Sequence, residues 1–111
     1  MDFSVSEFKR CDVVKASGRI DSYTAPEMEA AFTKLVEKSR YNLVFDTSEI
    51  TFISSAGWWA LIRIQKTCKQ LNRGELVLVK LDAKIKDSMN LVGIGQYFKI
   101  FEDLTVAVGS F

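Results

Sequence analysis

Two short segments in which almost every residue is apolar constrain the fold of this chain more than any other feature. They read NLVFD at residues 42–46 and ELVLVK at residues 75–80. A strand of this kind is covered on both faces, because a strand with one solvent-exposed face alternates apolar and polar residues. Both segments therefore predict central strands of a sheet that is covered by helices.

Segments with helical spacing of apolar residues separate these strands. The first, residues 24–39, begins with Thr24 and Glu27 in the arrangement of a capping box and has Pro26 in its first turn. Glycine or polar residues end each helical pattern. The other expected helices span residues 54–71, 82–93 and 103–108.

The remaining strand signals lie near the two ends of the chain and after the first central strand. Residues 3–7 and 13–18 predict an N-terminal hairpin. A turn at residues 47–49 is expected before a short strand at 50–53, and residues 98–101 predict a last short strand. A hairpin followed by alternating helices and strands predicts an α/β domain. Its sheet is expected to be mixed, mainly parallel and four- to five-stranded, with about four helices.

Length and charge exclude several classes of function. The 111 residues suffice for one domain, residues 1–111. The formal net charge of +1 does not provide the strongly positive surface that binds nucleic acid without sequence preference. No apolar run is long enough to span a membrane. The N-terminal residues do not have the pattern of a secretion signal, so we expect a cytoplasmic protein.

The residues needed for most enzymatic chemistry are missing. The chain contains no histidine, which removes Ser-His-Asp and Cys-His pairs and every metal site that needs imidazole. Cys11 and Cys68 are far apart in the sequence and are expected to be buried free thiols. Neither glycine-rich nucleotide motif is present. We therefore expect a protein that is not an enzyme and that holds no cofactor and no metal.

Two carboxylates are predicted where strands end. Asp21 and Asp46 would then lie at the edge where open α/β sheets bind ligands. A paired-acid or Mg²⁺ site is one interpretation. Capping of their own loops is the other, and it is the common role of loop aspartates.

The strongest candidate site is the sequence FISSAG at residues 52–57, where a strand leads directly into a helix. The N-terminus of a helix exposes N–H groups and carries about half a positive charge. A serine in this position can cap the helix, or it can accept a phosphoryl group that meets those N–H groups. Position alone leaves both interpretations open.

The pair Trp58-Trp59 lies in the first turn of the same helix. A spacing of 100° per residue places Trp59 and Arg63 opposite the apolar face, with Ile62 beside them and Trp58 on the flank. A large exposed aromatic residue is typical of a partner-binding anchor. We expect Trp58, Trp59, Ile62 and Arg63 to form a partner-binding surface, unless another helix covers Trp59.

Three stretches resemble the STAS domain family of anti-sigma factor antagonists and sulphate-transporter cytoplasmic domains. GRIDSYTA at residues 18–25 resembles the family loop G-[ED]-[LI]-D-x-x-[TN]-[AS]. LVFDTSEI at residues 43–50 resembles its buried strand and following turn, and FISSAG at residues 52–57 resembles its [FY]-[ILM]-D-S-[STA]-G signature. The order and spacing of the elements match over nearly the whole chain.

The resemblance implies a switch that is controlled by one serine. It places the phosphoacceptor on Ser55 and the family's loop acid on Asp21, with Ser22, Ser54 and Gly57 as neighbours of the switch. The implied partners are an anti-sigma factor that is also an ATP-dependent serine kinase, and a metal-dependent Ser/Thr phosphatase. The unphosphorylated form would bind the anti-sigma factor and so release the sigma factor.

The sequence departs from the family pattern at two places. Ser54 replaces the acid that usually precedes the phosphoacceptor, and Trp58-Trp59 replaces smaller residues. An alternative function is a constitutive STAS-type accessory or scaffold subunit, for example of a lipid-transport complex, in which Ser55 is not phosphorylated. A sensor of an anion or small ligand at the same helix end is a further alternative.

Overall fold

The computed structural model describes residues 2–111 of the chain, which form five strands and four α-helices. The strands are β1 (Asp2–Glu7), β2 (Asp12–Ile20), β3 (Asn42–Ile53), β4 (Glu75–Val79) and β5 (Ile100–Phe101). The helices are α1 (Ala25–Glu37), α2 (Ser55–Lys69), α3 (Ala83–Val92) and α4 (Leu104–Gly109). Single 3₁₀ turns follow α2 (Gln70–Asn72) and α3 (Gly95–Tyr97).

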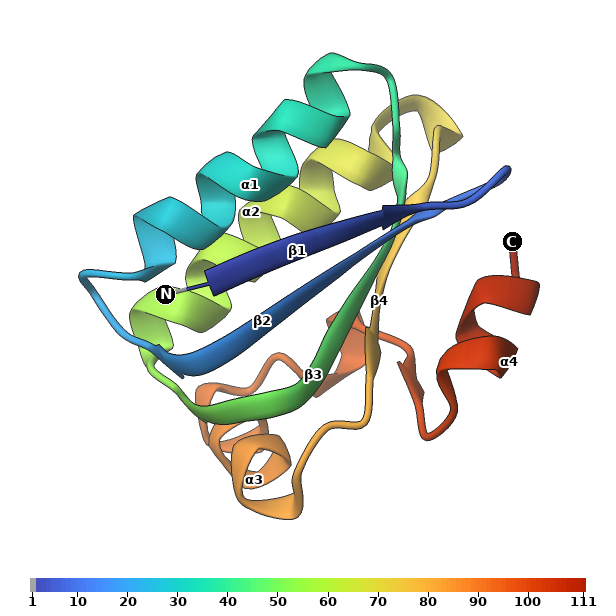
Figure 1. Cartoon of the computed structure of the whole chain (residues 1–111). Helices are drawn as coiled ribbons and strands as arrows, with labels where there is room; N and C mark the ends of the chain where they lie inside the picture. The colour runs from blue at the N-terminus through green and yellow to red at the C-terminus, as the bar shows by residue number, and fades with distance from the viewer. Residues whose placement is uncertain (1) are drawn as a thin grey trace.

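The five strands lie side by side in the order of the chain, β1-β2-β3-β4-β5. β1 is antiparallel to β2, and all later neighbours are parallel. Helices α1 and α2 lie next to each other over one face of the sheet, and α4 lies on the other face (Figure 1). The prediction of an α/β domain with a mixed, mainly parallel sheet is confirmed.

Alternation along the strands builds a core on each face of the sheet. The larger core lies under the first three helices, where Phe32 of α1 meets Phe45 of β3 edge to face with ring centroids 5.3 Å apart. Val44, one residue before Phe45, points to the smaller core under α4. This is why the central strands read as continuous apolar runs. Cys11 and Cys68 are both buried, and burial raises the pKa of Cys68 to about 12.

The predicted turn at residues 47–49 is wrong, because β3 continues without a break to Ile53. β4 pairs with β3 only as far as Asp46, so the second half of β3 has β2 as its one neighbour. Its exposed polar residues therefore belong to a half-covered strand. Thr47 is buried and donates its hydroxyl to the carbonyl of Val79, 2.7 Å away, where β4 ends. Asp46 consequently lies inside a strand and not at its end.

The predicted capping box at Thr24 is also wrong. The Thr24 hydroxyl does not cap α1; it donates to the carbonyl of Arg19 at 2.7 Å and accepts from the N–H of Asp21 at 2.9 Å. Both bonds hold the loop between β2 and α1. The last strand is shorter than expected, since only Ile100–Phe101 pairs with β4.

Candidate functional site

The corner between β3 and α2 contains two serines with different environments. Ser54 is the N-cap of α2, and its Oγ accepts a hydrogen bond from the Gly57 N–H at 3.2 Å. Its own N–H donates to the carbonyl of Ile20 at 2.8 Å, which ties the start of α2 to the end of β2. Ser55 is the first residue of the helix and is exposed. Its hydroxyl makes no hydrogen bond within the part of the chain that the structure describes, so it is available to an enzyme.

Gly57 allows α2 to approach the sheet closely at this corner. A Cβ at this position would lie 2.7 Å from Cγ2 of Ile20 and 2.9 Å from Cγ2 of Ile53. Contacts this short require a neighbour to move. The glycine of the signature is therefore explained by packing, and it holds the first turn of α2 against the ends of β2 and β3.

Asp21 follows Ile20 directly and so lies in the loop beside this corner. Its Oδ1 accepts hydrogen bonds from the N–H groups of Tyr23 at 2.9 Å and Thr24 at 3.1 Å. The backbone N–H of Thr24, followed by that of Tyr23, lowers the pKa of Asp21. The carboxylate thus caps its own loop, and among the described residues it makes no hydrogen bond to Ser55. Ser22, the next residue, is exposed in the same loop.

The structure does not bring Asp21 and Asp46 together as a paired-acid site. Asp46 is buried within β3 opposite Lys15, whereas Asp21 follows the end of β2. The Oδ1 of Asp46 accepts from the N–H of Ser48 at 3.0 Å. Over residues 2–111 there is no group of three or more histidine, cysteine or acidic side chains that could hold a metal ion.

Trp58 and Ile62 do not lie on the surface, which corrects the predicted partner-binding set. Trp58 is fully buried, its Nε1–H donates to Oγ of Ser88 on α3 at 3.0 Å, and its ring packs against Phe98 at a centroid distance of 6.2 Å. Ile62 is also in the large core, with 3% of its surface exposed. The reason is tertiary: α3 and the following turn pack on the flank of α2 that the helical spacing left open.

Trp59 and Arg63 remain on the outer side of α2. Trp59 is 49% exposed, as the helical spacing predicts. Arg63 makes two hydrogen bonds of 2.9 Å to the carboxylate of Glu29 on α1. These bonds lower the pKa of Glu29 and raise that of Arg63. Arg63 therefore joins α1 to α2, and Trp59 is the large apolar side chain that α2 leaves exposed.

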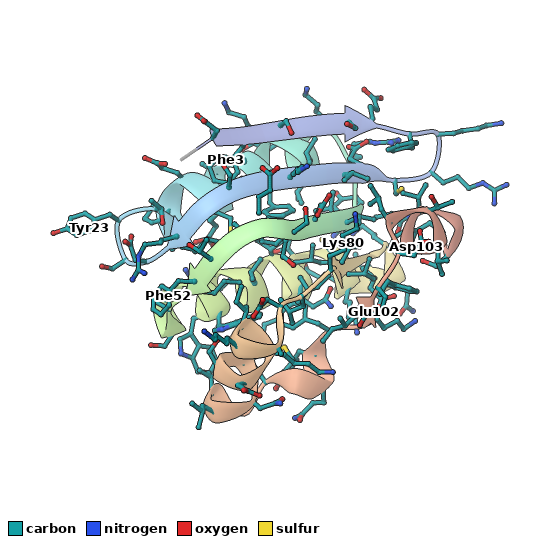
Figure 2. The ribbon with its side chains drawn as sticks, turned by 60° about the horizontal axis from the view of Figure 1, so that its bottom comes forward. Phe3, Tyr23, Phe52, Lys80, Glu102 and Asp103 are labelled. Carbon is teal, nitrogen blue, oxygen red and sulfur yellow. The ribbon has the colours of Figure 1, made fainter. Side chains whose placement is uncertain are left out.

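Two exposed aromatic residues near the corner were missed as candidates for binding. Tyr23 is 86% and Phe52 36% exposed. Both project outward at the same end of the sheet (Figure 2), and the guanidinium of Arg19 lies over the Phe52 ring, 4.3 Å from its centroid. No sequence signal marks the exposure of Phe52, because it follows from a register shift in which Gly18 pairs with Ile50 and Arg19 with Phe52.

These features define a small α/β domain whose strand-to-helix corner presents a free serine among exposed aromatic residues. The sequence model of the STAS domain matches residues 2–107, and the chain belongs to that family. No helix among residues 2–111 is both long and apolar enough to cross a membrane.

Several of the similar proteins are named anti-sigma factor antagonists. BtrV of Bordetella bronchiseptica, assigned as an anti-sigma factor antagonist, is 28% identical over 94 residues, which cover 85% of this chain and 80% of BtrV. An anti-sigma factor antagonist from Mycobacterium paratuberculosis has a structure with a TM-score of 0.85 at 27% identity, covering 98% of this chain and 92% of that one.

The fold is also that of SpoIIAA, the Bacillus cell fate determinant. Its unphosphorylated form gives a TM-score of 0.82 at 12% identity, covering 98% of this chain and 95% of SpoIIAA. Its phosphorylated form gives 0.75 at 13% identity, covering 98% of both chains. At this identity the similarity shows a shared fold.

Proposed function

We propose that this protein is a cytoplasmic, non-enzymatic anti-sigma factor antagonist whose binding to an anti-sigma factor is controlled by phosphorylation of Ser55. The observation that carries the proposal is that the two serines at the corner have different roles. Ser54 takes the capping role, which leaves the hydroxyl of Ser55 exposed and without a hydrogen bond among the described residues. The names of the relatives BtrV and the Mycobacterium paratuberculosis protein support the class of partner.

The proposed partner surface combines Ser55 with exposed aromatic side chains of the segments that meet at its corner. It consists of Tyr23, Phe52, Trp59 and the hydroxyl of Ser55 itself, and we call it the aromatic corner. Exposed aromatic side chains are enriched among the residues that dominate binding energy. A phosphate in their midst adds about 1.5–2 negative charges and disrupts close apolar contact. Phosphorylation would therefore end the interaction by charge and desolvation, without unfolding the domain.

The proposed reaction transfers the γ-phosphoryl group of ATP to Oγ of Ser55. A bond forms between Oγ and phosphorus, ADP leaves, and the hydroxyl proton passes to a base of the kinase, because none of residues 2–111 is hydrogen-bonded to the Ser55 hydroxyl. Hydrolysis by a metal-dependent Ser/Thr phosphatase would return the hydroxyl. Both enzymes are separate partners.

The test is incubation with ATP and the anti-sigma serine kinase encoded nearest to this protein's gene. Intact mass and peptide mapping should find one phosphate, on Ser55, and none in Ser55→Ala. Ser54→Ala is the matched control, and it should still be phosphorylated although it loses a helix cap. Phosphate on Ser54 alone, or on neither serine with a kinase that binds the protein, would contradict the switch. Tight binding with no phosphorylation would support the constitutive accessory subunit instead.

A further inference from the structure

Arg19 is the charged residue at the aromatic corner that the proposed function does not yet use. It is exposed, and its guanidinium lies over the Phe52 ring. In the sheet, Arg19 is opposite Phe52, and the next pair is Ile20 with Ile53. The carbonyl of Ile20 accepts from the N–H of Ser54, so the backbone that carries Arg19 is bound to the backbone that carries Ser55.

Two other charged groups near the corner, Arg63 and Asp21, are engaged or carry negative charge. Arg63 is engaged in two hydrogen bonds with Glu29. Asp21 is negative, its lowered pKa keeps it so, and the charge of Arg19 is one of the contributions to that lowering. Within residues 2–111, Arg19 has no ion pair shorter than 4.0 Å, and its recorded partner is the ring of Phe52. Arg19 is therefore an exposed cation on the strand whose end is bound to Ser54, and it is free to change partner.

We propose that Arg19 receives the phosphate on Ser55: phosphorylation draws its guanidinium from the ring of Phe52 to the phosphate oxygens. An exposed cation–π contact is weak, whereas a guanidinium and a phosphate form short, charge-assisted and often bidentate hydrogen bonds. The exchange orders the phosphate against the sheet edge and uncovers one face of Phe52. This inference rests on the proposed function, because it requires the phosphate to be on Ser55.

The experiment uses the full chain with phosphoserine installed at position 55 during translation, so that no kinase is needed. The pKa of the phosphate is measured by ³¹P NMR titration. An ordinary phosphoserine has its second pKa near about 6. A neighbouring cation favours the dianion and lowers this pKa, so Arg19→Gln should raise it by about half a unit or more relative to the wild type. Arg19→Lys keeps the positive charge, so the second pKa of the phosphate should lie close to its value in the wild type.

Two controls separate Arg19 from the helix end and from general effects of charge. Arg73 has the same kind of contact, with its guanidinium 4.7 Å from the centroid of the Tyr41 ring, so Arg73→Gln is a matched control that should leave the phosphate pKa unchanged. Phe52→Leu removes the ring that holds Arg19 and should not raise the phosphate pKa. If Arg19→Gln moves the phosphate pKa no more than Arg73→Gln does, the proposal is wrong. A failure of the kinase to phosphorylate Ser55 would instead contradict the proposed function and leave this result standing.

Discussion

Trp58 and Trp59 are adjacent in the sequence and differ in what each does for the molecule. Trp58 fills the space between α2 and α3 and satisfies its indole N–H on Ser88. Trp59 is half exposed and contributes to the aromatic corner. Their two roles, stability and binding, can be separated by substitution.

We expect Trp58→Ala to lower the free energy of unfolding by about 3–5 kcal/mol, because it removes a fully buried large aromatic side chain. Trp59→Ala should change it by no more than about 0.5 kcal/mol. It should weaken binding to the anti-sigma factor at least about tenfold. Urea unfolding and calorimetric titration measure the two effects. Unfolding of Trp59→Ala would show that this side chain is structural after all.

Asp21 is expected to contribute pH-dependent stability to its loop. Its pKa is lower in the folded state because backbone N–H groups bind the carboxylate. The stabilisation is therefore present above the unfolded pKa of about 4 and is lost as the pH falls through the lower folded pKa. Asp21→Asn should be less stable than the wild type at pH 7, and the difference should shrink below about pH 4.

The control for this measurement is Asp87→Asn. Asp87 is exposed on α3, and its carboxylate makes no hydrogen bond or ion pair with any residue from 2 to 111. Its substitution should leave the pH dependence of unfolding as it is in the wild type. A stability difference for Asp21→Asn that does not change with pH would mean that the charge of Asp21 plays no part.

The periodicity of α2 predicts the exposure of some of its side chains and misses that of others. The 100° spacing correctly placed Trp59 outside. It put Trp58 on the flank and Ile62 beside Trp59, but both are buried, because no pattern within α2 shows that α3 packs against this helix. Similarly, Ser54 was one of two possible caps in the sequence, and the choice is made by the hydrogen bond to Gly57.

The close packing of α2 on the sheet predicts the effect of Gly57→Ala. Alanine is the better helix former by about 1 kcal/mol. At this position its Cβ would collide with Ile20 and Ile53, and such overpacking costs about 1–3 kcal/mol or more. We expect a net loss of stability in thermal unfolding.

Gly109→Ala is the matched control, because this glycine lies in α4 and a Cβ there would have no atom within 4 Å. It should leave stability unchanged or raise it slightly. An equal gain for both variants would show that α2 can move away from the sheet at no cost.

For the whole molecule, the switch should act on the surface and leave the fold intact. A negative charge at the first position of α2 is favourable to the helix by about 0.3–1 kcal/mol. Ser55→Asp should therefore melt at or above the temperature of the wild type, and it should bind the anti-sigma factor at least tenfold more weakly. Ser55→Asn is the uncharged control of similar size. If Ser55→Asn weakens binding to the same extent, the effect comes from the size of the side chain and not from its charge.

The fold as a whole was largely predictable, because the helices carry the helical spacing of apolar residues and the central strands are short continuous apolar runs. Residues 47–49 were the main exception. Their polar composition is typical of a turn, yet they continue β3, because β2 extends beyond β4 and supplies hydrogen bonds on one side. The sequence of residues 47–49 does not reveal how long the neighbouring strand β2 is.

The order of the sheet has a consequence for synthesis on the ribosome. Because β1 to β5 lie side by side in chain order, each strand that emerges finds its neighbour already in place at the growing edge. None of the described strands has to enter between two others. The segment that forms the corner, β2 with β3 and α2, is complete once residue 69 has left the exit tunnel, before β4 has emerged from it. Nascent chains of increasing length should therefore gain structure in steps from the N-terminus.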